Sequence, residues 1–216
     1  MKMKKLLKVT LSLLCVLAMT GCGSKENKND TNSKKETTTQ KQENKQETSK
    51  YFKNFNQEYS LGGSLYSINI QDDATIKHGV TVDYFIVSDN NNREFKIVVN
   101  SSLKDNQISL EDIKNVFELK REDALMDLYD YNTVTLNEKN EDKISLKKYK
   151  EVLYESGNLT LSVENNTPNY VVYRFLTVNE DGDKTIFELM VCSDDYEEKD
   201  LKNIAEELIS QIHETE

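Results

Sequence analysis

The chain has 216 residues and a formal net charge of −10, with 28 Lys and Arg against 38 Asp and Glu. From residue 51 onward the balance is 17 basic to 33 acidic residues, a net charge of −16. Nucleic acids and anionic lipids repel so acidic a region, so we expect no nucleic-acid partner. Residues 51–216 have the size of one domain and are too few for the two lobes of a solute receptor.

Residues 1–21 have the order of a secretory signal, with a positive start, an apolar run and small residues before Cys22. The apolar run extends from Leu6 to Met19 and is shorter than the about 20 residues that a bilayer-spanning helix needs. We therefore expect a cleaved signal, and the alternatives are a transmembrane anchor or a buried core helix. The positive charge comes from four lysines, Lys2, Lys4, Lys5 and Lys8.

The segment Met19-Thr20-Gly21-Cys22 resembles the lipobox of bacterial lipoproteins, in which Gly or Ala precedes the modified Cys. Met19 departs mildly from that family, because Leu is commoner at this position. The resemblance implies cleavage before Cys22, a diacylglyceryl thioether on its sulfur, acyl chains such as palmitate, and attachment to the extracytoplasmic face of the cell membrane. Stable anchoring needs two acyl chains, since one chain binds only marginally. Lys outnumbers Arg by 25 to 3, which is typical of AT-rich coding and indicates a Gram-positive source.

Residues 23–50 contain almost no apolar side chain and consist mainly of Lys, Glu, Asn, Thr, Gln and Ser. Such a segment buries too little apolar surface to offset its ordering entropy, so we expect a disordered tether. A flexible coil of this length has an end-to-end distance of about 30 Å. The alternative is a tail that binds the cell wall or a partner. The expected organisation is a signal at 1–21, a lipidated Cys with its tether at 22–50, and one domain at 51–216.

Strands are predicted first in the domain. Residues 64–70 and 80–88 alternate apolar and polar side chains, as half-buried strands do. Three consecutive asparagines from Asn90 then turn the chain into a further strand at residues 94–99. The second and third of these strands are expected to form a hairpin.

A helix is predicted from Ser109, because Asp112 three residues later completes a capping box. Lys120 and Arg121 interrupt its apolar stripe, so we expect a kink or partial exposure there. The stripe itself follows near-helical spacing and consists of Leu110, Ile113, Phe117, Ala124, Leu128 and Tyr131.

Short strands are predicted at residues 133–136 and from residue 159 to residue 163. Between them we expect a second helix, with Gly157 placed to end it. The apolar residues of this helix are Leu146, Tyr149, Val152 and Leu153.

Residues 170–178 and 185–192 predict a hairpin, because the Asp-Gly step at 181–182 is a strong turn signal. Asp194 and Glu197 are expected to cap the last helix. The apolar face of that helix consists of Leu201, Ile204, Ala205, Leu208 and Ile212. The predicted order is β-β-β-α-β-α-β-β-β-α. It indicates an α+β fold in which helices cover an antiparallel sheet and a terminal amphipathic helix closes the chain.

The hairpin at residues 170–192 and the helix at residues 194–212 resemble the end of the small bacterial lipoproteins of the PsbP-like type. In those proteins an antiparallel sheet is covered by helices, and the closing helix follows a strand and an acidic cap. The aromatic-Pro segment that is frequent near the start of that domain is absent here, since the only proline is Pro168. The resemblance implies no catalytic residue.

The nearest approach to a metal motif begins at Thr177. Counted as an EF-hand loop, residues 177–188 place suitable residues at positions 3, 5, 6 and 12, namely Asn179, Asp181, Gly182 and Glu188. Position 1 lacks the usual Asp and the flanks are predicted strands, so the hairpin is the simpler explanation.

Two other acidic groups also have structural explanations. Asp194, Asp195, Glu197 and Glu198 complement the dipole of the last helix, and Asp72-Asp73 is most simply a turn. We therefore expect no metal ligand and no cofactor, with calcium binding kept as the alternative.

Cys192 is the one cysteine that remains after signal removal and lipidation of Cys22, so no intramolecular disulfide can form. A reactive thiol needs a base or a positive field, whereas Asp194 and Asp195 would raise its pKa. We expect Cys192 to be a buried apolar residue. His78 and His213 are the only histidines and form no motif, and His213 is expected near the end of the last helix. The absence of Trp weighs against a carbohydrate platform.

These observations favour a non-enzymatic, lipid-anchored protein whose domain binds another component of the cell envelope. One alternative is an envelope hydrolase or thiol-dependent enzyme that uses Cys192 or a carboxylate pair. The other is a calcium-dependent adhesion or signalling module. No catalytic residue is predicted, and Cys22 is the one site residue assigned.

Overall fold

The computed structural model describes residues 49–62, 65–78, 82–103, 109–130, 133–161 and 167–215. The chain divides into two compact units, residues 1–45 and 46–216, and the described residues all belong to the second. The predicted signal, Cys22 and nearly all of the tether lie outside the described residues. No helix within these ranges is long and apolar enough to cross a membrane.

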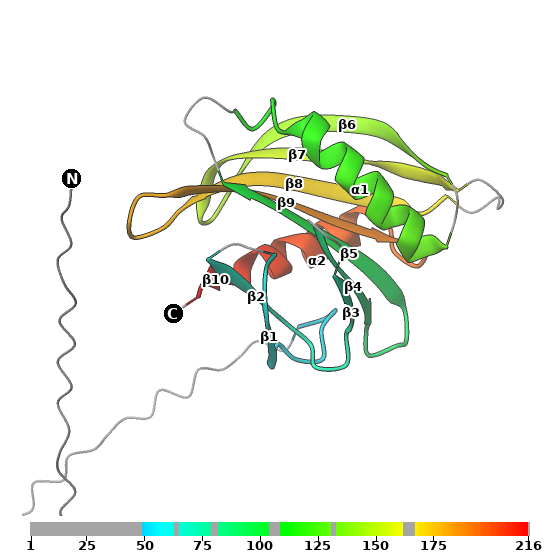
Figure 1. Ribbon diagram of the computed structural model, residues 1–216. Coiled ribbons are helices and arrows are strands. Elements are labelled where there is room, and N and C mark those ends of the chain that lie inside the picture. The colour runs from blue at the N-terminus through cyan, green and yellow to red at the C-terminus, as the bar shows by residue number, and fades with distance from the viewer. Residues whose placement is uncertain are drawn as a thin grey trace, which may run out of the picture. The chain divides into compact units, whose positions relative to one another are not determined.

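Ten strands and two helices make up the described part of the chain (Figure 1). In chain order they are β1 (Gln57–Ser60), β2 (Tyr66–Ile70), β3 (Thr75–His78), β4 (Val82–Ser88), β5 (Glu94–Leu103), α1 (Lys114–Tyr129), β6 (Val134–Leu146), β7 (Tyr149–Leu161), β8 (Asn169–Val178), β9 (Lys184–Ser193), α2 (Glu198–Ser210) and β10 (Ile212–Glu214).

The strands form two antiparallel sheets. The larger has seven strands in the order β3-β4-β5-β9-β8-β7-β6, and the smaller has three in the order β1-β2-β10. Every strand pairing in both sheets is antiparallel. The prediction of a mostly antiparallel α+β fold is confirmed.

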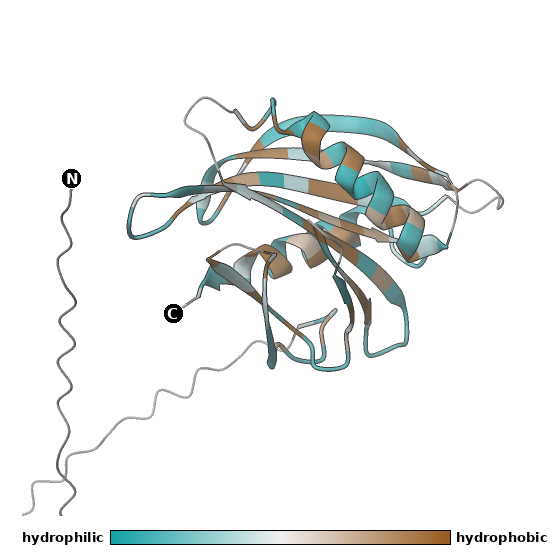
Figure 2. Ribbon diagram, in the orientation of Figure 1, coloured by the Kyte–Doolittle hydropathy of each residue, from teal (hydrophilic) through white to brown (hydrophobic). Residues whose placement is uncertain are grey.

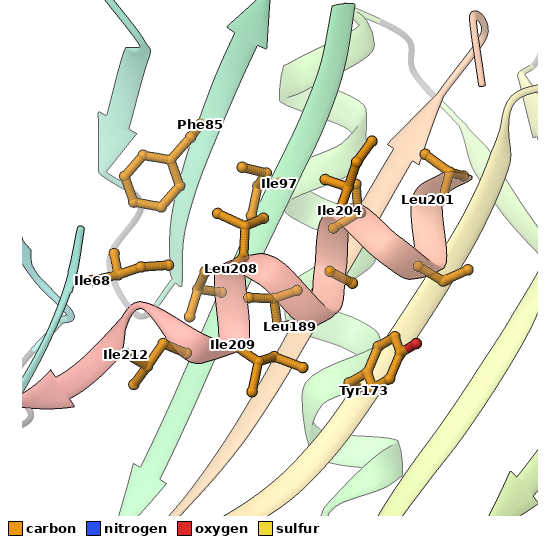
Figure 3. Close-up of a cluster of buried hydrophobic side chains, with 14 of the residues drawn as sticks. Ile68, Phe85, Ile97, Tyr173, Leu189, Leu201, Ile204, Leu208, Ile209 and Ile212 are labelled. Atoms are coloured by element: carbon orange, nitrogen blue, oxygen red, sulfur yellow. The ribbon is translucent and has the colours of Figure 1, made fainter. Parts of the chain in front are cut away.

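The helix α2 packs against β8 and β9 through one apolar stripe. Its buried residues are Leu201, Ile204, Ala205, Leu208 and Ile209. Figure 3 shows Ile204 and Leu208 close to strand residues such as Ile97 and Leu189. Together with β1, β2 and β10 the helix encloses the largest apolar cluster, which we call the α2 core. Hydrophobic residues line both α2 and the central strands in Figure 2.

The last helix is not the last element, contrary to the prediction. It ends at Ser210, and Ile212 belongs to β10, where it pairs with Ile68 of β2. The Ile212 side chain is still buried in the α2 core, so the apolar pattern continued past the end of the helix. The helix also begins later than the predicted Asp194–Glu197 capping box, because Glu197 is its N-cap residue and makes no side-chain capping hydrogen bond.

Alternate residues of the central strands point to opposite sides of the larger sheet. In β8, Tyr173 belongs to the α2 core, whereas Tyr170 belongs to a second cluster with residues of α1. The helix α1 lies on this opposite side and contacts β4, β5 and β6. A third cluster contains Phe117 of α1 and Ile186 of β9. The apolar surface beneath α1 is therefore divided into two clusters.

The hydrogen bonds predicted between Ser109 and Asp112 are present, but α1 begins later than predicted, at Lys114, and its N-cap residue Ile113 makes no side-chain capping bond. The Ser109 N–H donates to Asp112 Oδ2 and the Asp112 N–H donates to Ser109 Oγ, each over 3.1 Å. The predicted kink at Lys120 and Arg121 is wrong, because one continuous helix runs from Lys114 to Tyr129. Lys120 is partly exposed, as predicted, whereas Arg121 is fully buried and pairs with two carboxylates of the sheet.

The second predicted helix is wrong, because its residues form the β6–β7 hairpin. Both faces of β7 are buried, with Val152 in the α2 core and Leu153 beneath α1. A strand that is buried on both faces has consecutive apolar residues, and these resemble part of the apolar stripe of a helix, which explains the error. Gly157 does not end a helix. A Cβ there would lie 2.0 Å from the carbonyl oxygen of Asn137, so the close approach of β6 excludes any side chain.

The predicted β8–β9 hairpin is confirmed, with Gly182 at a positive φ of 86°. The strands predicted at residues 64–70 and 80–88 correspond to β2 and β4, and the one at 94–99 is the longer β5. Residues 64, 80, 131 and 162–163, where some predicted segments begin or end, lie outside the described residues. The strands β1, β3 and β10 were not predicted, because each is only three or four residues long.

Candidate binding site

A pocket of about 630 Å³ lies between the start of the domain and the end of α2. Ten residues line it: Ser49 and residues 52–56 from the segment before β1, Asn90 from the β4–β5 turn, and Glu207, Ser210 and Gln211 from the end of α2. We call it the amide pocket, because side-chain amides are its commonest polar groups. Its volume falls within the range of about 300–1,000 Å³ that is usual for ligand sites.

The segment before β1 is held by its own turn and by one buried ring. The Ser49 hydroxyl accepts the backbone N–H groups of Tyr51 and Phe52, at 3.0 and 2.9 Å. The Phe52 ring is buried in the α2 core and meets the Phe95 ring edge to face, with centroids 5.3 Å apart. Phe55 lies 4.8 Å from Phe52, centroid to centroid, and remains partly exposed in the pocket wall.

The Asp72-Asp73 turn supports this wall from behind. The Asn54 amide donates to Asp72 Oδ1 over 3.1 Å, and its oxygen accepts the Asp72 N–H over 3.2 Å. The Lys53 ammonium lies 2.6 Å from Asp73 Oδ2. The prediction that Asp72-Asp73 forms a turn is confirmed, and the turn's carboxylates hold pocket residues in place.

The polar groups that remain free in the amide pocket are mainly uncharged. The side-chain amides of Asn56 and Asn90 make no hydrogen bond with any described residue. Gln211 makes one, from its Nε2 to the Ser210 hydroxyl over 3.4 Å. Each amide offers two donors and an acceptor oxygen. The pocket can therefore match a ligand that carries both donors and acceptors without net charge.

Glu207 is the one carboxylate among the ten lining residues. Partial burial raises its pKa, and a hydrogen bond with the Ser49 hydroxyl opposes that rise. The single cation, Lys53, is neutralised by Asp73. The neighbouring C-terminal end of α2 carries partial negative charge, which disfavours anions. The electrostatics of the pocket thus favour a neutral ligand over a phosphate or a carboxylate.

A second polar group lies beneath α1, between its two apolar clusters. Two arginines and two glutamates, each at most 2% exposed, form the ionic cluster Arg121, Glu155, Arg174 and Glu188. Its shortest contacts join Arg174 Nη2 to Glu155 Oε2 at 2.5 Å and Arg174 Nε to Glu188 Oε2 at 2.7 Å. Arg121 lies 3.4 Å from Glu188 and 3.7 Å from Glu155.

Burial opposes the charge on Glu155, but Arg121 and Arg174 outweigh it and hold its pKa below the usual range. The Tyr170 hydroxyl adds a hydrogen bond to Glu155 over 3.1 Å. These contacts join α1 to three neighbouring strands of the sheet. The ionic cluster therefore positions the helix, and its burial separates it from the amide pocket.

Cys192 is fully buried in the cluster beneath α1 that contains Tyr170, and burial raises the pKa of its thiol to about 11. The Tyr129 hydroxyl donates to its sulfur over 3.6 Å. A thiol in this environment remains protonated at neutral pH and out of reach of a substrate. Its position agrees with the expectation of an apolar role and leaves the thiol-enzyme alternative without an accessible nucleophile.

The EF-hand alternative at residues 177–188 is inconsistent with the hairpin. Asn179 Oδ1 accepts the Asp183 N–H over 2.6 Å, which closes the β8–β9 turn. Glu188, at the position of the last calcium ligand, is instead paired with Arg174 in the buried ionic cluster. Residues 177–188 therefore do not form a calcium loop.

The acidic residues before α2 have separate structural partners. Asp195 accepts the Glu94 N–H over 3.0 Å, and Glu198 accepts the hydroxyls of Tyr154 and Ser156 over 2.8 and 2.9 Å. Across the ranges that the structure describes, no group of three His, Cys, Asp or Glu residues is placed to hold a metal ion.

The two histidines lie in different sheets. His78 ends β3 and pairs with Asp83 at 2.9 Å, whereas His213 lies in β10 and pairs with Glu58 at 3.2 Å. The prediction that His213 lies in the last helix is wrong, because α2 ends before it. The structure does not bring the two side chains together.

The amide pocket and the ionic cluster were both missed by the sequence reasoning. Residues 52–56 follow the polar tether directly, and only the two phenylalanines within them mark the start of packing. The sequence indicates the ionic cluster more clearly than it indicates the pocket. Arg174 and Glu188 each stand alone between apolar residues of a predicted strand, where an unpaired charge is not tolerated.

No protein-family model matches the chain, and no curated protein sequence matches it. Among solved structures it is similar to LpqN of Mycobacterium tuberculosis, described as involved in cell envelope biogenesis. That likeness has 14% identity and a TM-score of 0.43, over 70% of this chain and 83% of LpqN. It is also similar to CyanoP, the cyanobacterial PsbP of Synechocystis sp. PCC 6803. This second likeness has 14% identity and a TM-score of 0.44, over 73% of this chain and 91% of CyanoP. With TM-scores below 0.5, neither likeness decides family or function.

Proposed function

We propose that this chain is a lipid-anchored lipoprotein of the cell envelope, whose folded domain binds another envelope component in the amide pocket. The observation that carries the proposal is the pocket itself, a hollow of about 630 Å³ in which the polar groups without a partner are mainly uncharged amides. Its lining includes Ser49, near the end of the predicted tether, and residues 52–56 at the start of the domain.

The chemistry of the pocket supports binding rather than hydrolysis. A glycosidase uses two carboxyl groups about 5–10 Å apart, and Glu207 is the one carboxylate in the pocket lining. Lys53 is engaged with Asp73, and no pocket residue is a His or Cys. The lining offers recognition through hydrogen bonds without a nucleophile and base pair.

The proposed location rests on the lipobox. A diacylglyceryl group on Cys22 would hold the mature chain on the extracytoplasmic face of the membrane of a Gram-positive cell. A tether of 28 residues reaches about 30 Å as a flexible coil, so the domain can approach components near the membrane. With its net charge of −16 the domain is repelled by anionic lipid, which keeps the pocket accessible.

Labelling with palmitate tests the anchor. The full chain should incorporate radioactive palmitate in a bacterial host, whereas the Cys22→Ser variant should incorporate none and be released from membranes. Incorporation that persists in the variant would contradict lipidation at Cys22.

Retention of envelope material tests the pocket. The full-length chain, purified in detergent and immobilised, should retain a component of envelope extracts that the Asn56→Trp variant loses, because the indole fills the pocket. Asn115→Trp, on the exposed side of α1, is the matched control and should retain the component. Equal retention by both variants would exclude the amide pocket as the binding site.

A further inference from the structure

The lining of the amide pocket identifies a class of ligand, and this inference rests on the function proposed above. We propose that the amide pocket binds a neutral, hydroxyl-rich glycan chain. The three observations that support it are the free amides, the partly exposed ring of Phe55, and the absence of an unpaired cation in the lining.

The free amides match the hydrogen-bonding pattern of sugars. Every sugar hydroxyl both donates and accepts, and a side-chain amide does the same within one planar group. The side-chain amides of Asn56 and Asn90, in a loop and a turn, make no hydrogen bond with the described residues. Gln211 adds a third amide at the end of α2. A charged ligand would find no comparable set of partners here.

Phe55 supplies an apolar surface in the same lining. Its ring packs against the buried Phe52 ring at an interplanar angle of 39°, which fixes its orientation while part of it stays exposed. The C–H groups on one side of a sugar ring pack well against such an aromatic face. The absence of Trp, which weighs against a carbohydrate platform in the sequence, is therefore offset by a phenylalanine held by its neighbour.

The charges around the pocket exclude the anionic polymers of the envelope. Lys53 is occupied by Asp73, Glu207 adds negative charge, and the carboxyl end of α2 adds more. The domain as a whole carries a net charge of −16. A polyanion would be repelled at long range and would gain no ion pair on arrival.

A peptide ligand fits the lining less well than a glycan. Proteins commonly bind extended peptides by adding a strand to an open sheet edge. None of the ten lining residues lies in a strand, because the pocket is built from a loop, a turn and the end of a helix. The lining therefore does not include the open strand edge with which an extended peptide pairs.

Titration of the full-length chain in detergent tests the ligand class. The probes are a tetramer of N-acetylglucosamine, a tetramer of glucose, a neutral tetrapeptide and a polyglycerol phosphate, each followed by isothermal titration calorimetry. At least one of the two neutral oligosaccharides should bind with a Kd below about 1 mM. The peptide and the polyanion should not bind.

Variants assign the binding to the pocket. The double variant Asn56→Ala/Asn90→Ala should weaken oligosaccharide binding by about tenfold, because each lost hydrogen bond leaves a sugar hydroxyl unpaired. Phe55→Leu keeps an apolar side chain but removes the ring face, and should weaken binding by about fivefold. Asn115→Ala is the matched control and should leave the affinity unchanged. Thermal unfolding confirms that each variant is folded before it is titrated.

The outcomes separate this inference from the proposed function. If neither oligosaccharide binds, or if binding is equal in wild type and the double variant, the glycan assignment is wrong. If the peptide or the polyanion binds instead, and Asn56→Trp abolishes that binding, the ligand class is wrong while the pocket keeps its binding function. If Asn56→Trp also leaves the retention of envelope material unchanged, both proposals are wrong.

Discussion

The two faces of the seven-stranded sheet hold their helices by different chemistry. On one face, α2 buries five apolar side chains against β8, β9 and the smaller sheet. On the other, α1 also packs through apolar residues, but Arg121 lies in the middle of its buried stripe. The Arg121 guanidinium pairs with the carboxylates of Glu155 and Glu188, which lie on the α1 side of the sheet.

The two helices therefore differ in how far non-directional burial sets their position. Each fully buried Leu or Ile side chain of α2 contributes about 1.5–3 kcal/mol, whatever its exact orientation. The stability of the ionic cluster depends on the orientation of its side chains, because a buried charge is tolerated only next to its partner. Three of its guanidinium nitrogens, Nε and Nη2 of Arg121 and Nη1 of Arg174, make no hydrogen bond with the described residues. The contacts of α1 therefore stabilise the fold less than those of α2, but they fix the position of the helix more specifically.

Removing one charge beneath α1 should have the largest effect on stability. Arg174→Met removes the closest cation from Glu155 and Glu188 and leaves them with Arg121 and Lys114, which lie at 3.4–3.9 Å, so it should lower the free energy of unfolding by about 3–5 kcal/mol. Urea denaturation followed by circular dichroism measures this loss. A loss below about 1 kcal/mol would mean that water reaches the cluster.

Replacing the whole cluster tests whether ion pairs or apolar contacts hold α1 better. The quadruple variant Arg121→Met/Glu155→Leu/Arg174→Met/Glu188→Leu makes the α1 face resemble the α2 face. Buried ion pairs often lose nothing when they are replaced by apolar groups of similar volume, so we expect most of the stability lost in Arg174→Met to return. A quadruple variant that is less stable than Arg174→Met would show that the cluster contributes net stability.

A cavity in the α2 core should have the next largest effect. Leu208→Ala removes a fully buried side chain and should lower the free energy of unfolding by about 2–5 kcal/mol. The loss should not depend on pH or salt, unlike that of Arg174→Met. Leu119→Ala, at a residue of α1 that is 69% exposed, is the control and should change stability by less than about 0.5 kcal/mol. An equal loss in both variants would contradict the burial of Leu208.

Acid should weaken the α1 face selectively. The pKa of Glu155 is held below its ordinary value of 4.5, so the unfolded chain binds this proton more readily than the folded one. The stabilisation is complete above the unfolded pKa and is lost as pH falls through the folded pKa. Unfolding free energies measured from pH 7 to pH 3 should therefore decline less steeply in Glu155→Gln than in wild type. Identical slopes would mean that Glu155 has the same pKa in both states.

The same contrast explains what sequence reasoning reached and what it missed. The α2 stripe was predicted almost completely, because apolar residues at helical spacing have one simple meaning. Arg121 was taken for an interruption, since a charge is normally exposed and its partners Glu155 and Glu188 lie far away in the sequence. Pairing across such distances is invisible without the topology of the sheet.

Two other features, the β7 strand and the amide pocket, were missed because of their local sequence. The β7 strand was taken for a helix because both of its faces are buried, so that Val152 and Leu153 are apolar neighbours instead of alternating with polar residues. The amide pocket was missed because its loop, apart from two phenylalanines, is as polar as the tether that precedes it. Asn56 and Asn90 line the same pocket because the fold brings the β4–β5 turn beside the start of the domain.

The smallest predicted effect concerns the one carboxylate of the amide pocket, at the end of the α2 face. Partial burial raises the pKa of Glu207 above its ordinary value of 4.5, so the folded state disfavours its charge and stability falls as pH rises through this range. Glu207→Gln should therefore raise the urea midpoint slightly at pH 7 and leave it unchanged at pH 4, whereas Glu180→Gln in the exposed β8–β9 turn should change neither. A lower midpoint at pH 7 would mean that the hydrogen bond from Ser49 outweighs the desolvation of Glu207. On the α1 face buried carboxylates are stabilised by arginines, whereas the Ser49 hydroxyl offsets only part of the desolvation of Glu207, so the charge of Glu207 lowers the stability of the folded state.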